Sequence, residues 1–209
     1  RIRKGSSVMQ RIITVGREFG SGGRELGRRL AEELGYDYYD KEIIQAIADK
    51  TSLSVEYVKQ VVESKPHNLF PITVANSFSY IDSYASQQLQ SVYAAQCTIL
   101  RELAQKSPCI IIGRCADYIL SDMKPLRMFI YADMDSRVRR CLDREDDGEN
   151  MSVKEMQRTI RTIDRGRAKY YEFYTGMRWG DKVNYDLCIN TTNANIKELA
   201  PYLAKGLSI

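Results

Sequence analysis

The fold is decided by residues 11–35, RIITVGREFGSGGRELGRRLAEELG. Residues 11–15 form a short apolar run of β-branched side chains, which predicts a buried strand. From residue 24 to residue 34 a leucine recurs at every fourth position, which predicts one face of a helix that Gly35 ends. The glycine-rich residues between these elements therefore join a strand directly to a helix.

This connection has the chemistry of a phosphate-binding loop. Gly20, Gly22 and Gly23 permit positive φ and close backbone approach, so successive N–H groups can converge on an anion at the helix N-terminus. The standard pattern G-x-x-x-x-G-K-[ST] also supplies a lysine for the phosphates and a hydroxyl for magnesium. Neither group is present here in register. The alternative interpretation is a glycine-rich turn that merely joins the strand to the helix.

Other residues of the loop are candidates for the missing groups. Arg24 is the first candidate for the phosphate-binding cation, in a catalytic role, and Arg17 is the second. Ser21 is the nearby hydroxyl and a candidate magnesium contact, while Glu25 stands where the helix begins. Together with the three glycines, Ser21, Arg24 and Glu25 form the predicted nucleotide-phosphate site. Catalytic competence does not follow from an arginine here, because its planar fork differs from a compact ammonium group.

The rest of the chain repeats the strand and helix alternation, which predicts an α/β fold with a five-stranded parallel sheet. Further strands are predicted at residues 36–39, 109–112, 127–131 and 187–190, and helices at 41–50, 55–64 and, as one or two helices, 76–106. The second and third strands are separated by more residues than a minimal crossover needs. Residues 41–107 are therefore assigned in part to a substrate-covering helical insertion. His67, in a Pro-bounded break at 65–71, is assigned no role.

Composition narrows the class of protein. The 209 residues, 44% of them hydrophobic, suffice for one sizeable core. The five cysteines are scattered without a C-x-x-C pair, which predicts neither a disulfide framework nor a zinc site. No membrane span and no signal peptide are recognised, so a cytoplasmic protein is expected. The net charge of +4 suits anionic ligands, whereas nucleic-acid binding is not expected without an aromatic and basic motif. Residues 1–8 are interpreted as a leader or an added segment.

Three separated blocks resemble one known family. They are IITVGREFGSGGRELGRRLAEELGYDYYDKEII from residue 12, CIIIGRCADYIL from residue 109, and DRGRAKYY from residue 164 followed by WGDKVNYDLCINTT. In this order they resemble the cytidylate kinase-like family. The resemblance implies a P-loop nucleoside-monophosphate kinase fold, a three-layer sandwich with a monophosphate-binding insertion and a short lid at about residues 141–160 that closes over ATP. It also implies ATP and Mg²⁺ as cofactors, and one kinase-like domain over residues 9–209.

The resemblance also implies an acceptor site that has lost part of its pattern. Arg114 matches an arginine on the acceptor phosphate, but the aspartate that follows it in the family, which reads the cytosine amino group, is Cys115 here. Asp164 and Arg167 match the family's aspartate and arginine after the lid, and Lys41 stands roughly where a serine follows the second strand. The family arginine expected near that serine is Ala46, and another is Ile160. The resemblance therefore implies phosphate contacts on the acceptor side without most of the family's base-reading residues.

Arginines flank the predicted lid. Phosphoryl transfer needs cations around a group whose charge spreads over three oxygens. Two sets recur at helical spacings on either side of the polar residues 145–151, namely Arg137, Arg140 and Arg144, and Arg158, Arg161 and Arg165. Arg137, Arg140 and Arg161 are taken as catalytic candidates. The alternative is a solvated basic face paired with nearby acids.

Two acids and one aromatic residue complete the candidates. Asp40 follows the second strand at the carboxyl edge of the sheet, where it is expected to hold a magnesium-bound water or to orient the acceptor. Its alternative role is an ordinary helix N-cap. Asp133, after the fourth strand, is the second candidate. Trp179 is expected to pack in the fold rather than to stack on a base.

Two functions are consistent with these residues. The first is an ATP-dependent small-molecule kinase that phosphorylates a nucleoside monophosphate or a related phosphorylated or hydroxyl acceptor. The second is a nucleotide- or anion-binding protein of the same fold with little or no kinase activity, because the loop lacks its lysine and its magnesium hydroxyl. The sequence leaves open the acceptor, the choice between ATP and GTP, and the oligomeric state.

Overall fold

The computed structural model describes residues 12–63, 81–143 and 151–207, and its sheet has five strands in the order β2-β3-β1-β4-β5. The strands are β1 Ile12–Arg17, β2 Asp37–Tyr39, β3 Cys109–Ile112, β4 Leu126–Tyr131 and β5 Leu187–Asn190. Every neighbouring pair is parallel, and Ile13 lies between Ile110 and Leu126 in the register. The predicted α/β class and the five-stranded parallel sheet are confirmed.

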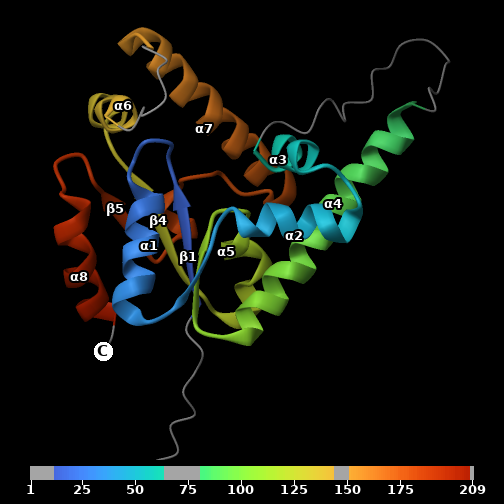
Figure 1. Ribbon diagram of the computed structural model, residues 1–209, viewed down its shortest axis with the longest axis horizontal. Helices are drawn as coiled ribbons and strands as arrows, with labels where there is room; N and C mark the ends of the chain where they lie inside the picture. The colour runs from blue at the N-terminus through green and yellow to red at the C-terminus, as the bar shows by residue number, and fades with distance from the viewer. Residues whose placement is uncertain (1–11, 64–80, 144–150, 208–209) are drawn as a thin grey trace, which may run out of the picture.

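Helices cover both faces of this sheet and form a three-layer arrangement (Figure 1). The helices are α1 Gly23–Leu34, α2 Glu42–Thr51, α3 Val55–Glu63, α4 Ile81–Lys106, α5 Ala116–Ile119, α6 Met134–Leu142, α7 Val153–Thr175 and α8 Ile196–Leu207, with short 3-10 turns at Ser121–Met123 and Lys182–Asn184. Helices α1 and α8 lie on one side of the sheet, and α2, α4 and α5 lie on the other.

The alternation of side chains in the strands explains why both faces are apolar. In β1, Ile13 and Val15 pack with α1 and α8, whereas Ile12 belongs to the core on the opposite face. In β3, Ile110 and Ile112 pack with α1 and α8, whereas Cys109 and Ile111 belong to the core on the opposite face. A strand whose two faces are both buried reads as a continuous apolar run, which is what the sequence shows.

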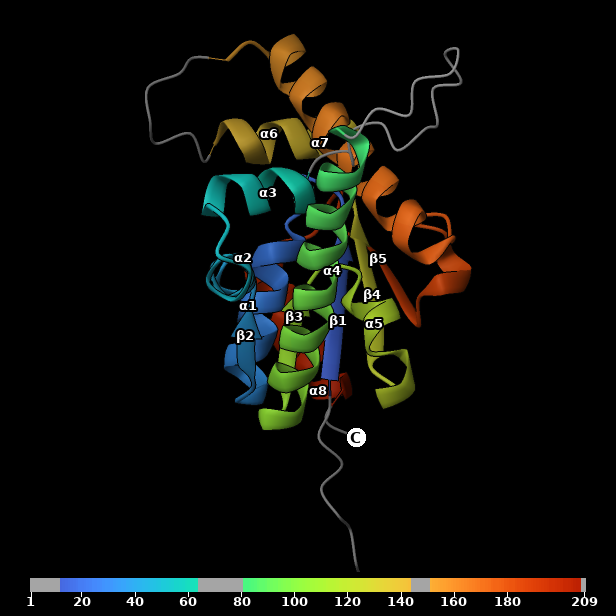
Figure 2. The same cartoon turned by 90° about the vertical axis from the view of Figure 1, so that its right-hand side faces the viewer.

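Helices α3, α6 and α7 lie beyond the carboxyl ends of the strands (Figure 2). Helix α6 packs on α7 through a small separate core of Val138, Met156 and Ile160, against which Phe19 is placed. These two helices flank the predicted lid, but residues 144–150, which include Arg144, lie outside the described residues. The elements that follow the strands therefore gather around the loop that follows β1.

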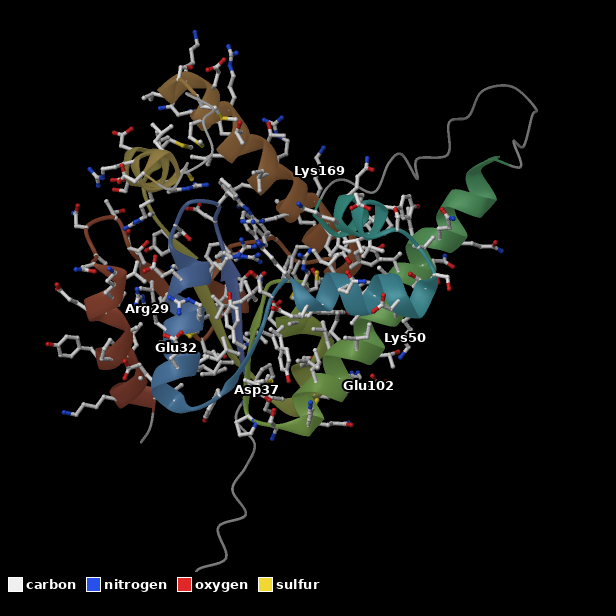
Figure 3. The ribbon with its side chains drawn as sticks, viewed as in Figure 1. Arg29, Glu32, Asp37, Lys50, Glu102 and Lys169 are labelled. Carbon is white, nitrogen blue, oxygen red and sulfur yellow. The ribbon has the colours of Figure 1, made fainter. Side chains whose placement is uncertain are left out.

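Between β2 and β3 the described residues form three helices, in the range predicted for an insertion. The described part of the predicted 76–106 segment is one helix, α4, and Lys50 on α2 pairs with Glu102 on α4 at 3.3 Å (Figure 3). Residues 64–80, with His67 and the predicted break, lie outside the described part, as do residues 1–11. Over the stretches that are described, no helix combines the length and the apolar character that crossing a bilayer requires. The division into insertion, lid and leader stays a prediction.

Candidate functional site

The loop between β1 and α1 is closed by its own hydrogen bonds. Gly20 and Gly22 have φ of 76° and 81°, in the left-handed region that favours glycine. The amide of Ser21 donates to the carbonyl of Glu18 at 3.3 Å, and the Ser21 hydroxyl donates to the same carbonyl at 2.8 Å. The amide of Gly23 donates in turn to the Ser21 hydroxyl at 3.3 Å. Ser21 is fully buried, so its hydroxyl is a support of the loop rather than an open magnesium contact.

Three other amides of the loop take no part in its closure. With the described residues, the amides of Gly20, Gly22 and Arg24 form none of the hydrogen bonds that close the loop or begin α1. These N–H groups lie at the N-terminus of a helix, where the partial positive charge also favours an anion. Glu25 pairs with Arg29 at 3.0 Å along the outer side of the helix. The arrangement provides the donors that the predicted anion nest requires.

Arg137 supports the loop from α6. Its side chain is 6% exposed, its Nε donates to the carbonyl of Phe19 at 2.7 Å, and its Nη1 lies 3.1 Å from a carboxylate oxygen of Glu18. Its Nη2 pairs with Asp164 of α7, which also accepts the amide of Phe19 at 2.8 Å. Arg137, predicted as a catalytic cation, and Asp164, predicted as an acceptor contact, are both used by this network to hold the loop against α6 and α7.

Asp40 lies at the carboxyl end of β2 and faces two arginines. It is 3% exposed, and its carboxylate lies 2.5 Å from Nε of Arg24 and 3.8 Å from Nη2 of Arg17. The residue at the N-cap of α2 is Lys41, which makes no side-chain cap hydrogen bond. Within the described residues no amide of the first turn of α2 donates to the Asp40 carboxylate, so the alternative of an N-cap role gains no support from the geometry. Asp133, in contrast, caps α6 by accepting the amide of Ser136 at 2.7 Å.

Three arginines from different elements converge behind the loop. They are Arg17 at the end of β1, Arg114 after β3 and Arg167 on α7, and the first two are 8% and 7% exposed. Burial, followed by the charges of Arg167 and Arg114, lowers the pKa of Arg17. Arg167 donates from Nη1 to the carbonyl of Arg17 at 3.2 Å and lies over the ring of Phe19. Such a concentration of buried positive charge is typical of a site for an anion.

The turn after β3 has a strained backbone. Gly113, Arg114 and Cys115 have successive φ values of 68°, 61° and 52°, and only the first is a glycine. Gln96 of α4 is fully buried and donates from Nε2 to the carbonyl of Arg114 at 2.9 Å. Tyr170 of α7 donates its hydroxyl to Oε1 of Gln96 at 3.1 Å. Gln96 could not be predicted from the sequence, because an uncharged residue within a long helix carries no local signal for this contact.

A small cavity of about 40 Å³ opens beside this turn. Its lining includes Arg17, Arg114 and Arg167, together with Cys115 and Asp117. Tyr171 donates its hydroxyl to Asp117 at 2.7 Å, and burial raises the pKa of that carboxyl. Asp117 was not among the sequence candidates, although it lies two residues beyond the position where the family pattern has its aspartate. The site therefore has a carboxyl group despite Cys115.

Two larger cavities adjoin the small one. One, of about 410 Å³, is lined by the loop glycines Gly20, Gly22 and Gly23 and by residues of α6 and α7, among them Arg140. The other, of about 1100 Å³, lies between α2, α3 and α7 and includes Lys41 in its lining. Arg24 lines both.

The remaining candidates are placed as follows. Arg140 donates to the carbonyls of Thr191 and Ala194, the second at 3.4 Å, and so orders the connection from β5 to α8. Arg161 is exposed and lines none of these three cavities, so its predicted catalytic role gains no support from the geometry. Trp179 packs its ring edge against Phe129, with centroids 5.2 Å apart, and also lines the small cavity.

The hydrogen-bond donors and the charged groups of the site determine whether it can hold ATP and Mg²⁺. Loop amides that take no part in closing the loop, together with buried arginines, fit the phosphates of ATP. For the part of the chain described, no cluster of three or more histidine, cysteine or acidic residues forms a metal cage. Mg²⁺ that arrives with nucleotide phosphates keeps several waters, so it needs few protein ligands. Both carboxylate oxygens of Asp40 already face arginines. Asp40 would therefore contact Mg²⁺ through a bound water rather than directly.

Comparison with known proteins gives consistent matches over most of the chain. The sequence model of the cytidylate kinase-like family matches residues 12–193. A cytidylate kinase of Methanopyrus kandleri is 25% identical over 191 residues, which cover 87% of this chain and 84% of the relative. A cytidylate kinase of Thermoplasma acidophilum is 24% identical, with 93% and 91% of the two chains covered.

Solved structures show the same fold. An uncharacterized protein from Eubacterium ventriosum has a TM-score of 0.68 at 27% identity, over 95% of this chain and 99% of the other. The shikimate kinase of Bacteroides thetaiotaomicron has a TM-score of 0.55 at 14% identity, with 95% and 99% covered. At that identity the second likeness concerns the fold alone, which is that of P-loop kinases.

Proposed function

Because this chain belongs to the cytidylate kinase-like family, we propose that it is an ATP-dependent kinase that phosphorylates a nucleoside monophosphate or a related small acceptor. The observation that carries the proposal is the sharing of residues between two cavities. Arg17 and Arg167 line both the cavity at the phosphate loop and the small cavity at the strained turn. A donor on one side and an acceptor on the other would therefore meet at these two cations.

The positions of the cations suit phosphoryl transfer. The transferred group spreads its charge over three oxygens, and catalysis consists mainly of positioning and of electrostatic stabilisation. In this proposal the amides of Gly20, Gly22 and Arg24 bind the phosphates of ATP, and Arg167 contacts the group in transfer. When bound, ATP supplies that group and Mg²⁺ neutralises phosphate charge. The chain's own residues orient the reactants, and the walls of the cavities exclude water from them.

The acceptor would lie on the side of the strained turn. Arg114 and Arg167 line the small cavity and suit an anionic acceptor, and Lys41 stands at the edge of the largest cavity. The small cavity, at about 40 Å³, has room for water molecules but not for a nucleobase. A base would therefore extend into the larger cavity between α2, α3 and α7, and only its edge would face the small cavity and Cys115.

A coupled assay of ADP release tests the proposal. CMP, dCMP, UMP, AMP, GMP and a panel of phosphorylated metabolites are offered with ATP and Mg²⁺, and ATP alone is the control. We expect at least one acceptor to raise ADP release well above that control. An Arg167→Met variant should lose this activity, whereas a variant of the exposed Arg158 on the same helix should keep it.

The second candidate function is nucleotide or anion binding without catalysis. It is favoured by the pairing of Arg24 with Asp40 at 2.5 Å, which engages the cation first expected to replace the lysine. Binding of ATP in calorimetry without ADP release for any acceptor would support this function and contradict the kinase.

A further inference from the structure

The phosphate loop differs from the standard pattern by an exchange of a glycine and a cation between two positions. When G-x-x-x-x-G-K-[ST] is aligned on residues 17–24, Gly22 matches the second glycine of the pattern. Arg17 then stands at the first glycine, and Gly23 stands at the lysine. The loop thus has a large cation where the pattern has a glycine, and a glycine where the pattern has a cation.

Space, rather than backbone conformation, explains why residue 23 is a glycine. Gly23 is not among the residues with positive φ in the described part, so its backbone suits other side chains. A Cβ atom at this position would lie 2.6 Å from Cβ and 3.3 Å from Cγ of Arg17, and 3.0 Å from Cβ of Ile130. These atoms lie next to the backbone and cannot move aside cheaply. The side chain of Arg17 therefore fills the space beside residue 23.

From there the guanidinium of Arg17 extends to the strained turn after β3. A Cβ atom on Gly113 would lie 2.0 Å from Nη1 of Arg17, so the guanidinium is stacked directly on that glycine. Gly113 also has φ of 68°, which disfavours any other residue. The charge of Arg17 thus lies between the phosphate loop and the acceptor-side cavity.

The charge of Arg17 is only weakly balanced by the described residues around it. Its ion pair with Asp40 is long, 3.8 Å, while that carboxylate lies 2.5 Å from Arg24. Its neighbours include the like charges of Arg114 and Arg167. A buried charge is costly unless it is closely paired, and an anion bound at this position would supply the pairing.

We propose that Arg17 binds the transferred phosphoryl group and performs, from the end of β1, the task of the lysine that is missing at position 23. This inference rests on the proposed function and assigns the cation within it. In the reaction an unprotonated phosphate oxygen of the acceptor forms a bond to the terminal phosphorus of ATP, the bond from that phosphorus to its bridging oxygen breaks, and ADP leaves with the electron pair of that bond. Arg17 stabilises the charge of the group and transfers no proton.

The test combines single and double variants, with activity and binding measured separately. Arg17→Met should lower kcat/KM by about 100- to 1000-fold, the usual loss when one preorganised donor to a transition state is removed. Arg17→Lys should retain more activity than Arg17→Met, because it keeps the charge. Without ligand, Arg17→Met should melt at the same or a higher temperature than the parent protein, since it relieves repulsion among buried arginines. Arg28→Met, on the exposed side of α1, is the matched control.

The exchange itself is tested by restoring the standard pattern. Arg17→Gly removes both the cation and the Cβ atom that obstructs residue 23, and Gly23→Lys introduces the lysine. Each single variant should be impaired, whereas the double variant Arg17→Gly/Gly23→Lys should recover at least about tenfold in kcat/KM over Arg17→Gly, a non-additivity expected for residues in contact. A folded double variant no better than Arg17→Gly would overturn the exchange, and so would an Arg17→Met protein with kcat/KM within twofold of the parent.

Binding measurements keep this inference separate from the kinase proposal. If the parent protein releases no ADP with any acceptor, the kinase function fails. Calorimetry with MgATP and with inorganic pyrophosphate then still tests Arg17. Loss of affinity in Arg17→Met but not in Arg28→Met would support the inference, and equal affinity in all three proteins would overturn it.

Discussion

At Cys115 the backbone conformation favours a residue such as aspartate or asparagine, but the residue present has a thiol. Its φ of 52° is strained for most side chains, but aspartate and asparagine adopt it more readily. The thiol is 4% exposed, and burial, followed by Asp117, raises its pKa, so it remains neutral and weakly polar. A thiol of this kind cannot select cytosine by accepting a hydrogen bond from its amino group.

We therefore predict weak selectivity for CMP and its recovery in Cys115→Asp. The parent protein should prefer CMP to UMP by about tenfold or less, which corresponds to about 1.4 kcal/mol. Cys115→Asp should raise this ratio, and Cys115→Asn, which has the same shape without the charge, is the control. The measurement is kcat/KM for both substrates in all three proteins. A parental preference of about a thousandfold would show that other residues read the base.

Asp117 provides a prediction of pH dependence. Because burial raises the pKa of this carboxyl above its ordinary value of 3.8, the folded state holds the proton at pH values where the unfolded chain has released it. The stabilisation from this proton is complete below the unfolded pKa and is lost as the pH rises through the folded pKa. Asp117→Asn keeps an acceptor for Tyr171 and has no such dependence.

The free energy of unfolding of Asp117→Asn, relative to the parent, should therefore rise as the pH increases from about 4 toward neutrality. Urea unfolding at a series of pH values measures this difference. Asp122→Asn, at an exposed carboxyl paired with Arg101, is the control, and because that pairing lowers its pKa its relative stability should change in the opposite direction. A flat or falling difference for Asp117→Asn would contradict the prediction.

At the scale of elements, the loop after β1 is held by two helices that are distant in sequence. Arg137 of α6 and Asp164 of α7 both bind Phe19, across separations of 118 and 145 residues. The loop, α6 and α7 therefore form one unit, in which the apolar cluster of Val138, Met156 and Ile160 joins the helices.

Arg137→Met should break the unit. It leaves Glu18 and Asp164, which are 26% and 16% exposed, without their shared cation. Removing one partner of a buried ion pair costs about 3 to 5 kcal/mol, and the partial exposure of Glu18 favours the lower value. Urea unfolding measures this loss, and the affinity for ATP should fall as well. Arg139→Met, at the exposed neighbouring position of α6, should change neither quantity by more than about 0.5 kcal/mol.

For the whole molecule, the proposed ligands bind where α3, α6 and α7 approach the carboxyl edge of the sheet. ATP with Mg²⁺ should therefore stabilise the entire fold by mass action, by about 2.7 kcal/mol at a hundredfold excess over Kd. For a chain of this size that corresponds to a rise in melting temperature of roughly 5 to 10 °C. Hydrogen exchange should slow most in the phosphate loop, α6 and the first half of α7, and least near the C-terminal end of α4. Equal slowing of hydrogen exchange in all elements, or no slowing in any of them, would contradict this placement of the ligands.

Much of the architecture was determined by local sequence. The apolar runs of β1, β3 and β4 and the leucines of α1 have the periodicities that backbone geometry imposes on neighbouring residues, and the left-handed Gly35 ends α1 as predicted. The phosphate loop was predicted for the same reason, since its glycines, its strand and its helix are contiguous. For the five strands and for the helices up to residue 106, the predicted boundaries agree with the described residues to within two positions, whereas α5, α6, α7 and α8 were not predicted with bounds.

The assignment of the site's side chains depended on the tertiary structure. From the sequence, Arg24 was the first candidate for the cation, Arg137 and Asp164 were ligand contacts, and Asp117 and Gln96 had no role. Only the fold shows that Arg24 pairs with Asp40, and that Arg17 fills the space beside Gly23. The physical reason is that burial and pairing depend on distances between residues far apart in the chain. The periodicities that determine strands and helices contain no information about those distances.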